Sequence, residues 1–441
     1  MRALYNILFV FLFCLSVPYY FWKLWRRGGW RDGFEQRFGH HGGRLKQALT
    51  NREVLWLHAV SVGEVNVCAQ LIRALEPRVP NLKMVVSTTT TTGMGRLREQ
   101  LPAHIEKIYY PVDRRACVRR ALAAVHPVAV VLVEAEIWPN FLWQLQDART
   151  PAFLINARLS ERSFRGYRRF GFLFRPLFAT FAGVGAQDEA DAARLRELGC
   201  RAQAIRVVGN LKFDAAQAAV QSRLDVPRLF RQIGWPGDVL VLVGGSTHAG
   251  EETLLADIFQ RLRGKFPNLR LVLVPRHFER GRAVGGELQA RGVKFVYRSE
   301  LTAERRLGTG EVECLLVNTT GELRHFYEHA DVIFVGKSLT AEGGQNPIEP
   351  GALGKAMVFG PNMQNFAAIA EAFVRAGGAA RVADTQALEN AICELLAWPD
   401  RRRELGENAL RVVKANQGAV ERTADMIVEE LARRGVYAAG K

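Results

Sequence analysis

Hydrophobic positions along the chain form short runs that are separated by amphipathic stretches. From about residue 51, near-continuous apolar runs alternate with stretches of helical periodicity, which is typical of parallel strands covered by helices on both faces. The runs of the first half are Val54–Val60, Met84–Thr88, Ile105–Tyr110, Ala129–Val133, Ala152–Ile155, Gly183–Ala186 and Ile205–Val208.

A polar segment, residues 214–238, carries Pro227 and Pro236 and predicts a linker. The alternation then restarts with Val239–Val243, Leu269–Val274, Val293–Val296, Cys314–Val317, Val332–Val335 and Ala356–Phe359, followed by helical patterns at Leu388–Ala397 and Arg401–Arg434. The pattern predicts an α/β chain with two Rossmann-like domains, residues 51–222 and 223–416, which face each other across a cleft. Residues 417–441 form a final helix that can pack back on the first domain.

The first residues follow a different pattern. Residues 3–22 contain no charge, and twenty apolar residues are just long enough to span a bilayer as a helix. Tyr19, Tyr20, Trp22 and Trp25 gather at one end, as in an interfacial aromatic belt. A cleaved signal peptide is the alternative, but bulky aromatics follow Pro18 where a cleavage site needs small residues. We therefore expect residues 1–22 to be a membrane anchor helix.

The following segment, residues 23–50, is basic. It carries Lys23, Arg26, Arg27, Arg31 and Arg37 near the apolar run, against Asp32 and Glu35. Because positive residues next to an anchor stay in the cytoplasm, the bulk of the protein is expected on the cytoplasmic side of its membrane. The spacing of Trp30, Phe34 and Phe38 predicts a short helix lying on that membrane.

Charge adds a constraint on partners. The formal net charge of +16 implies an anionic partner, which is a nucleic acid, an acidic membrane surface or a phosphorylated substrate. Arginines interleave with aromatics in residues 158–175, a pattern that suits nucleic acid or anionic lipid, and the anchor favours lipid. The structural alternative is a core helix whose arginines reach out to solvent. The arginines of this predicted acceptor and membrane surface are Arg158, Arg162, Arg165, Arg168 and Arg169.

Common cofactor and metal motifs are absent from the sequence. There is no G-x-G-x-x-G after a strand, no Walker A loop, no H-E-x-x-H and no D-x-D at a strand end. The six cysteines form no C-x-x-C pair, which argues against a zinc site and against a disulfide framework. We expect a mechanism without a metal or a bound cofactor.

Two carboxylates of the first half follow apolar strands. Glu64 ends the segment His58–Glu64 where a helix should begin, so it is either a catalytic group or a residue that complements the helix dipole. Glu134 follows the run that ends at Val133, where a carboxylate is costly unless it is paired or functional. Lys212 is a candidate partner, and a purely structural Glu134–Lys212 pair is the alternative.

Loops of the second half suit a nucleotide. Residues 244–252 are rich in small residues and open a helix, whose backbone donors favour phosphate. Three further loops of the second half also follow strand ends. The four loops together predict a nucleotide site. Its candidate residues are Ser246, Thr247, Pro275, Arg276, Thr320, Gly321, Glu322, Asn346, Pro347, Ile348 and Glu349.

Taken in order, these motifs resemble a known family. HAVSVGE, STTTTTG, VEAEIWPN, NARLSERS, GNLKFD, GSTHAGEE, LVPRHFER, TGEL and GGQNPIEP run from residue 58 to 350. They resemble the lipid IVA 3-deoxy-D-manno-octulosonic acid (Kdo) transferases, membrane-anchored glycosyltransferases of the GT-B fold. The resemblance implies inverting transfer of Kdo from CMP-Kdo to lipid IVA during lipopolysaccharide assembly.

The resemblance also implies roles for residues. Glu64 would be the base that accepts the proton of the acceptor hydroxyl, Glu134 and Lys212 would stabilise the transition state, and the second-half loops would hold CMP. Three donor-loop residues depart from the family pattern, and these are Phe278, Lys337 and Gln345. Another GT-B enzyme that uses a UDP-sugar on a lipid-linked acceptor is the alternative function. A basic, membrane-tethered nucleic-acid-binding protein is disfavoured by the ordered strand-end motifs.

Overall fold

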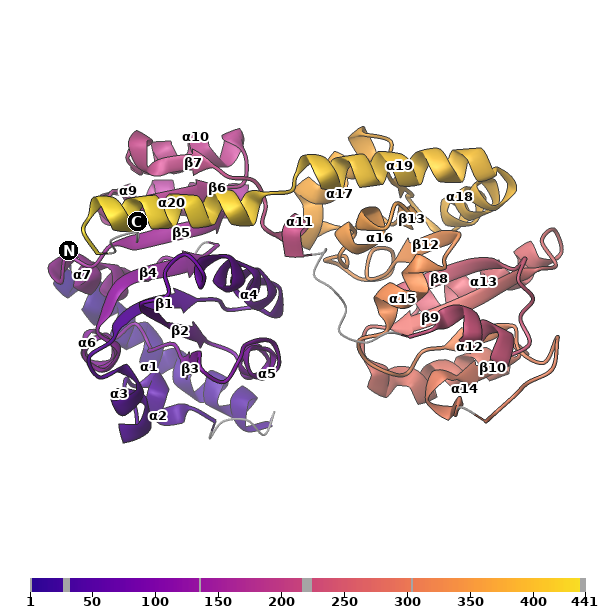
Figure 1. Cartoon of the computed structure of the whole chain (residues 1–441), viewed down its shortest axis with the longest axis horizontal. Helices are drawn as coiled ribbons and strands as arrows, with labels where there is room; N and C mark the ends of the chain where they lie inside the picture. Colours follow the sequence, from indigo (N-terminus) through magenta and orange to yellow (C-terminus); the bar gives the residue numbers. More distant parts are fainter. Residues whose placement is uncertain (1, 27–31, 135, 216–223, 303, 437–441) are drawn as a thin grey trace. The chain divides into compact units, whose positions relative to one another are not determined.

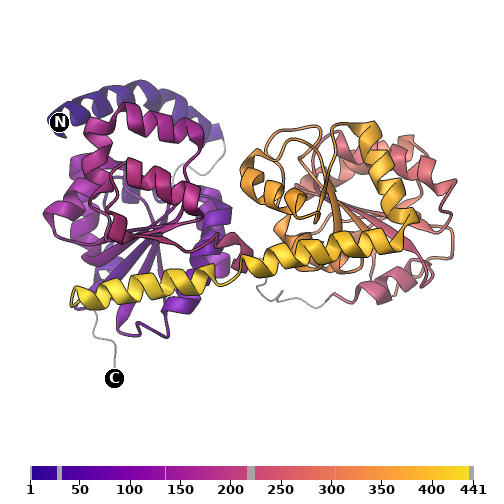
Figure 2. The ribbon, with the colours of Figure 1, turned by 90° about the horizontal axis from the view of Figure 1, so that it is seen from above.

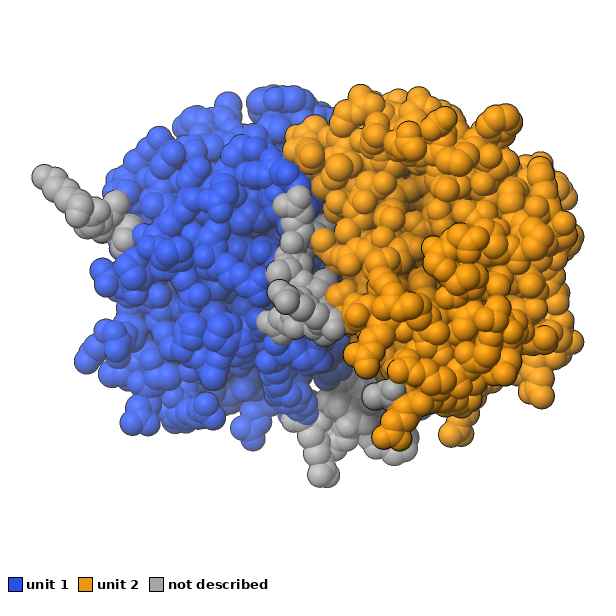
Figure 3. All heavy atoms as spheres, turned by 45° about the vertical axis from the view of Figure 1, so that its right-hand side comes forward, with its two compact units in different colours: residues 1–215, 417–441 blue, residues 216–416 orange. Residues whose placement is uncertain are grey.

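The computed structural model describes residues 2–26, 32–134, 136–215, 224–302 and 304–436 (Figure 1). The chain forms two compact units, coloured separately in Figure 3. Unit 1 comprises Met1–Ala215 and Gln417–Lys441, and unit 2 comprises Ala216–Asn416. Each unit holds one seven-stranded sheet in which every neighbouring pair of strands is parallel. The predicted fold class of two parallel α/β domains is confirmed.

Unit 1 is built from one sheet and the helices around it. Its strands are β1 (Glu53–His58), β2 (Leu82–Thr88), β3 (Glu106–Tyr109), β4 (Pro127–Val133), β5 (Ala152–Ala157), β6 (Gly183–Ala186) and β7 (Ile205–Val207). Its helices are α1 (Arg2–Arg26), α2 (Phe34–Arg37), α3 (Gly43–Leu49), α4 (Val62–Leu75), α5 (Thr91–Gln100), α6 (Arg115–Val125), α7 (Pro139–Asp147), α8 (Glu161–Arg169), α9 (Gly171–Phe178), α10 (Glu189–Glu197), α11 (Lys212–Ala215) and α20 (Ala419–Arg433).

Alternate residues of β1 point to opposite faces of the unit 1 sheet, as the strand pleat requires. Leu55 and Leu57 pack with α4, α5 and α20 on one face. Val54 and Trp56 pack with α3, α6, α7, α9 and α10 on the other. Figure 2 shows α20, in yellow, on the side of the sheet away from α1, in indigo. The last helix of the chain is therefore part of the core of unit 1.

Unit 2 repeats the architecture. Its strands are β8 (Leu240–Thr247), β9 (Leu269–Pro275), β10 (Phe295–Tyr297), β11 (Cys314–Leu316), β12 (Val332–Val335), β13 (Ala356–Phe359) and β14 (Ala380–Arg381). Its helices are α12 (Val226–Gln232), α13 (Glu251–Arg263), α14 (Gly281–Ala290), α15 (Leu323–Glu328), α16 (Ile348–Ala352), α17 (Ala367–Arg375), α18 (Thr385–Ala397) and α19 (Pro399–Ala415).

The strand order places a switch point in each sheet. In unit 1 the order is β3-β2-β1-β4-β5-β6-β7, so the chain winds outward from β1 and then restarts at β4 on its other side. In unit 2 the order is β10-β11-β9-β8-β12-β13-β14, and the restart falls between β8 and β12. Ligands of open α/β sheets bind beyond the carboxyl ends of the strands at such points. The loops after β1, β4, β8 and β12 are therefore the places to look for a site.

Helix α1 lies against unit 1 through its first turns. Arg2 forms an ion pair with Asp147 at 2.7 Å, and the Tyr5 hydroxyl donates to Asp113 at 2.8 Å. The opposite side of α1 exposes large apolar side chains, namely Leu4, Ile7, Leu8, Val10, Phe11, Leu12, Leu15 and Trp22. Among the described residues, no helix is long and apolar enough to cross a membrane. The expectation that residues 1–22 form a spanning anchor is therefore not confirmed.

Several local predictions need adjustment. The expected linker contains α12, which begins with Pro227 in its first turn, a position where proline is compatible with a helix. The expected helix at residues 401–434 is divided in two, because Gly418 adopts a left-handed conformation between α19 and α20. Phe34 and Phe38 are in ring contact at 5.2 Å beside α2, whereas Trp30 and the expected boundary at residues 222–223 lie outside the described residues.

Candidate active site

Glu64 sits at the switch point of unit 1, where the loop after β1 leads into α4. Ser61 caps the helix by accepting from the Glu64 amide, and the Glu64 carboxylate accepts in return from the Ser61 amide and hydroxyl. The other carboxylate oxygen accepts from the Val60 amide at 2.9 Å. This reciprocal capping box fixes the carboxylate just beyond the strand. Glu64 therefore has a helix-start role, which is compatible with a chemical role for the same carboxylate.

Two neighbouring carboxylates alter the electrostatics of Glu64. Its side chain is only 8% exposed, and burial followed by the negative charge of Glu134 raises its pKa above the usual range. Burial also raises the pKa of Glu136, whose carboxylate accepts from the Trp138 indole N–H at 2.7 Å. A raised pKa makes a carboxylate a stronger proton acceptor once it is ionised. The acidic cluster of Glu64, Glu134 and Glu136 is therefore suited to taking up a proton.

The histidine of the same segment is not available for this chemistry. His58 is fully buried on β1, its ring is stacked on Tyr110 at 3.8 Å, and its Nδ1 is 2.9 Å from the Ser87 hydroxyl. Burial lowers its pKa to about 3, so the ring is neutral at physiological pH. His58 is part of the core.

Glu134 and Lys212 form the expected pair, with 2.8 Å between Lys212 Nζ and Glu134 Oε1. Glu134 has a left-handed backbone, φ +60°, at the end of β4. Non-glycine residues in such conformations are held by their surroundings and concentrate at functional sites. Here the Glu134 amide donates to the Ile155 carbonyl at 2.9 Å, which fixes the residue against β5.

Asn156 opens the motif NARLSERS, but no role was predicted for it. It is fully buried at the end of β5, and its side-chain oxygen accepts from the Leu211 amide at 3.1 Å. Its side-chain nitrogen is 3.5 Å from Glu134 Oε1. Asn156 thereby holds the loop that carries Lys212 against the strand that carries Glu134. The sequence signal that could have identified Asn156 is a polar residue at the otherwise apolar end of a strand.

In unit 2, a buried carboxylate joins the two loops at the switch point. Glu251, at the first position of α13, is 1% exposed. It accepts from the His248 amide at 2.9 Å and from three amides after β12, those of Lys337 (2.7 Å), Ser338 (3.0 Å) and Leu339 (3.1 Å). Four backbone donors satisfy the carboxylate and fix the loop after β8 against the loop after β12.

The next residue, Glu252, stabilises the same loop through its buried side chain. It is also 1% exposed, and it accepts from the Thr247 hydroxyl at 2.9 Å and from Arg280 at 2.7 Å. Thr247 is fully buried, so its hydroxyl is occupied by the protein. Ser246 has a left-handed backbone with φ +51° and is partly exposed.

Other predicted nucleotide residues lie on neighbouring loops of unit 2. The Arg276 amide donates to the Thr247 carbonyl at 3.0 Å, which places Pro275–Arg276 beside the loop after β8. The Asn346 side chain accepts from the Ile348 amide at 3.1 Å and donates to Glu349 at 3.1 Å. The positive charges of Arg324 and Arg276 act on Glu349, although burial dominates and raises its pKa.

Glu322 has partners of its own. It pairs with Arg298 at 3.0 Å and accepts from the Thr319 hydroxyl at 2.5 Å, while Thr320 and Gly321 form the turn before it. No contact in the described part of unit 2 joins Glu322 to Arg276. Across the described ranges, no three His, Cys, Asp or Glu side chains are grouped so that they could hold a metal ion.

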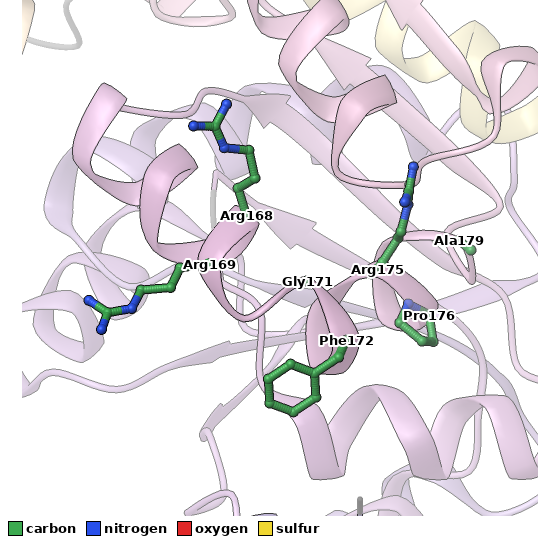
Figure 4. A pocket seen from close by; sticks show the side chains of 8 residues that line it. Arg168, Arg169, Gly171, Phe172, Arg175, Pro176 and Ala179 are labelled. Carbon is green, nitrogen blue, oxygen red and sulfur yellow. The ribbon is translucent and has the colours of Figure 1, made fainter.

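The arginine-rich segment forms an exposed surface on α8 and α9. Phe164 is the buried residue of α8, while Arg162, Arg165, Arg168 and Arg169 are exposed. A hollow of about 740 Å³ is lined by Arg168, Arg169, Phe172 and Arg175, whose side chains are labelled in Figure 4. Phe170 and Phe172 expose their rings at this surface. The segment therefore packs Phe164, Leu177 and Phe178 into the core of unit 1 and exposes arginines and aromatic rings on its outer side.

The fold and the sequence both identify relatives. The structure of UDP-GlcNAc 2-epimerase from Neisseria meningitidis bound to UDP-GlcNAc is similar with a TM-score of 0.59 and 14% identity, covering 86% of this chain and all (100%) of that one. Because identity is low, this likeness shows a GT-B-like fold alone. The class of protein is thus one with two parallel-sheet α/β domains in a GT-B-like fold.

The sequence comparisons specify the family. A family model described as 3-Deoxy-D-manno-octulosonic-acid transferase (kdotransferase) matches residues 32–215. The 3-deoxy-D-manno-octulosonic acid transferase of Bordetella pertussis is 33% identical over 93% of this chain and 95% of its own, and that of Haemophilus influenzae is 30% identical over 92% of each. The chain belongs to the 3-deoxy-D-manno-octulosonic acid transferase family of glycosyltransferases.

Glu251 provides a test of how unit 2 is held together. In Glu251→Gln, an amide nitrogen replaces one acceptor oxygen, so buried amides of the loop after β12 lose their partner at a cost of about 2–4 kcal/mol. We expect the amides of Lys337, Ser338 and Leu339 to exchange hydrogen about 30- to 1000-fold faster, measured by peptide-resolved mass spectrometry.

The matched control is Glu300→Gln, which alters a half-exposed pair with Arg305 in the same unit. Surface pairs contribute about 0–1 kcal/mol, so exchange in the loop after β12 should not change. Equal exchange in Glu251→Gln and in the wild type would contradict the assigned role of Glu251.

Proposed function

We propose that the protein transfers Kdo from CMP-Kdo to lipid IVA, with inversion at the anomeric carbon. Family membership supports the transferred sugar, and the motifs HAVSVGE and GGQNPIEP support the donor and the acceptor. The observation that carries the mechanism is the buried Glu64 carboxylate, fixed at the switch point of unit 1 beside Glu134.

Glu64 is the general base in this proposal. The acceptor hydroxyl loses its proton to Glu64, its oxygen forms a bond to the anomeric carbon of Kdo, and CMP leaves with the bonding electrons. A single displacement inverts the anomeric configuration. The Ser61 and Val60 donors hold the carboxylate in one orientation, and the negative charge of Glu134 raises its proton affinity. Lys212, paired with Glu134, offsets negative charge in the acidic cluster and stabilises the transition state with it.

Unit 2 is the donor-binding unit in this proposal. CMP carries a phosphate as its leaving group, and positively charged side chains with backbone amides stabilise the charge that develops there. The loops after β8, β9 and β12 supply Ser246, Arg276 and the residues Asn346–Glu349. The base and the donor loops thus lie at the two switch points, one in each unit.

We further propose that unit 1 binds the cytoplasmic surface of the inner membrane through α1 and the α8–α9 surface. Tyr5 of α1 and Tyr167, Leu173 and Phe174 of α8–α9 pack against the same core cluster, so both features cover one face of the sheet. The exposed side of α1 is apolar, and α8–α9 adds arginines and exposed Phe170 and Phe172. Apolar side chains enter the interfacial layer and arginines bind anionic headgroups, including the phosphates of lipid IVA.

Transfer can be tested directly with purified full-length protein. Incubation with CMP-Kdo and lipid IVA should give a product whose mass has increased by the mass of added Kdo, detected by mass spectrometry, with release of CMP. UDP-N-acetylglucosamine in place of CMP-Kdo should give no product. Transfer from the UDP-sugar, without transfer from CMP-Kdo, would refute the proposed donor.

Replacing Glu64 by Gln separates its helix-capping role from its role as the general base. Gln at the third position of a helix also completes a capping box, so Glu64→Gln should fold like the wild type and bind CMP equally well. It cannot take up the proton, and kcat should fall by about 10²- to 10⁴-fold in the transfer assay. Glu76→Gln, at the other end of the same helix, is the control and should keep full activity. An active Glu64→Gln variant would exclude Glu64 as the base.

Membrane binding depends on the exposed side of α1 in this proposal. Phe11 is 62% exposed, and Phe11→Ser should reduce co-sedimentation with anionic phospholipid vesicles several-fold without changing the unfolding temperature. Trp398 in unit 2 is similarly exposed at 66%, and Trp398→Ser should leave sedimentation unchanged. Equal losses in both variants would show that the effect is not specific to α1.

A further inference from the structure

Lys337 occupies the switch point of unit 2 with a constrained backbone. It follows β12 by two residues, and its amide donates to Glu251 at 2.7 Å while its carbonyl accepts from the Gly344 amide at 2.9 Å. These bonds on both sides hold it at φ +55°. A lysine side chain makes this left-handed conformation costly, whereas glycine adopts it freely. Retaining a side chain at such a position indicates that the side chain itself is used.

The Lys337 ammonium lies beside Gly343 in the loop that leads to α16. A Cβ built on Gly343 would be 3.3 Å from Lys337 Nζ and 2.7 Å from Asn365 Nδ2. Two nitrogen donors, one of them charged, therefore lie on the side of Gly343 that a side chain would otherwise occupy. Among the residues that the structure describes, neither Lys337 Nζ nor Asn365 Nδ2 has an acidic partner or a hydrogen bond to the protein.

The loop after β8 adds a third polar side chain to this region. Gln345 Nε2 is 3.2 Å from His248 Nε2, and a neutral histidine can accept this hydrogen bond. Burial lowers the pKa of His248, and the positive charge of Lys337 lowers it further, which favours the neutral ring. The neutral ring and the Gln345 amide do not neutralise the Lys337 ammonium. Within the described part of unit 2, the Lys337 ammonium at the carboxyl end of β12 therefore has no acidic side chain in direct contact.

We propose that Lys337 and Asn365 form an oxyanion subsite beside Gly343, which binds an acidic group of the nucleotide-activated sugar. This inference rests on the proposed function and specifies part of the donor site. The acidic group is either the phosphate of the nucleotide or the carboxylate of the sugar, since a lysine recognises both as an oxyanion. The subsite also gives a function to a lysine at a position that favours glycine.

The test uses the full-length protein and two ligands. The Kd of CMP is measured by calorimetry, and the KM of CMP-Kdo is measured in the transfer assay. We expect Lys337→Met to raise the KM of CMP-Kdo by about tenfold or more, because a charge-assisted hydrogen bond is lost. If the subsite binds phosphate, the Kd of CMP rises by a similar factor. If it binds the sugar carboxylate, the Kd of CMP does not change. Asn365→Ala should affect the same ligand less strongly, and Lys337→Arg should restore most of the affinity.

Two controls separate binding from folding. Lys337→Gly removes the side chain and relieves the backbone, so its unfolding temperature should equal or exceed that of the wild type while the ligand effect remains. Lys294→Met removes an exposed lysine elsewhere in unit 2 and should change neither constant. If the wild type binds CMP and turns over CMP-Kdo, and Lys337→Met does so equally well, the subsite is refuted while the proposed function stands. A wild type that binds neither ligand overturns both.

Discussion

The carboxylate of Glu251 determines how the loops of unit 2 are arranged. It is buried, and it accepts from one amide before α13 and from three amides after β12. Glu251 and Lys337 are 86 residues apart in the sequence, yet β8 and β12, the strands before their loops, are neighbours in the sheet. A buried carboxylate is costly unless donors satisfy it, so the two loops must stay together for unit 2 to fold. The backbone of Lys337 and the loop of residues 343–345 depend on this contact.

Glu64 occupies the matching place in unit 1, at the start of the helix after the first strand of the sheet, and its surroundings differ. Its carboxylate accepts from Val60 and Ser61 of its own loop and, within the described part of unit 1, from no amide after β4. The loop after β4 supplies Glu134 and Glu136 instead. The same position therefore carries a structural carboxylate in unit 2 and one suited to accepting a proton in unit 1. The number of donors and the charge of the neighbours make the difference.

Sequence patterns predicted the strands well, because a strand buried on both faces must be apolar along its length. They failed where structure depends on distant partners. The charge-free run at residues 3–22 predicted a spanning helix, which is not confirmed, and gave no sign that Arg2 and Tyr5 bind Asp147 and Asp113, more than a hundred residues away. β14 has only two residues, too few for a pattern. Similarly, roles were predicted for Glu64, Glu134 and Lys212, but not for Asn156 and Glu251, which stand in the motifs NARLSERS and GSTHAGEE and act through distant backbone amides.

The two switch points differ in charge in a way that matches sugar transfer. In unit 1 the loops after β1 and β4 bring Glu64, Glu134 and Glu136 together, which favours uptake of a proton. In unit 2 the acidic residues Glu251 and Glu252 are buried and satisfied by donors, and the partly exposed Lys337 is the basic residue of the loop after β12. Taking a proton from an alcohol and stabilising an anionic leaving group require opposite potentials. In the proposed mechanism, the residues that follow the central strands of the two sheets supply both.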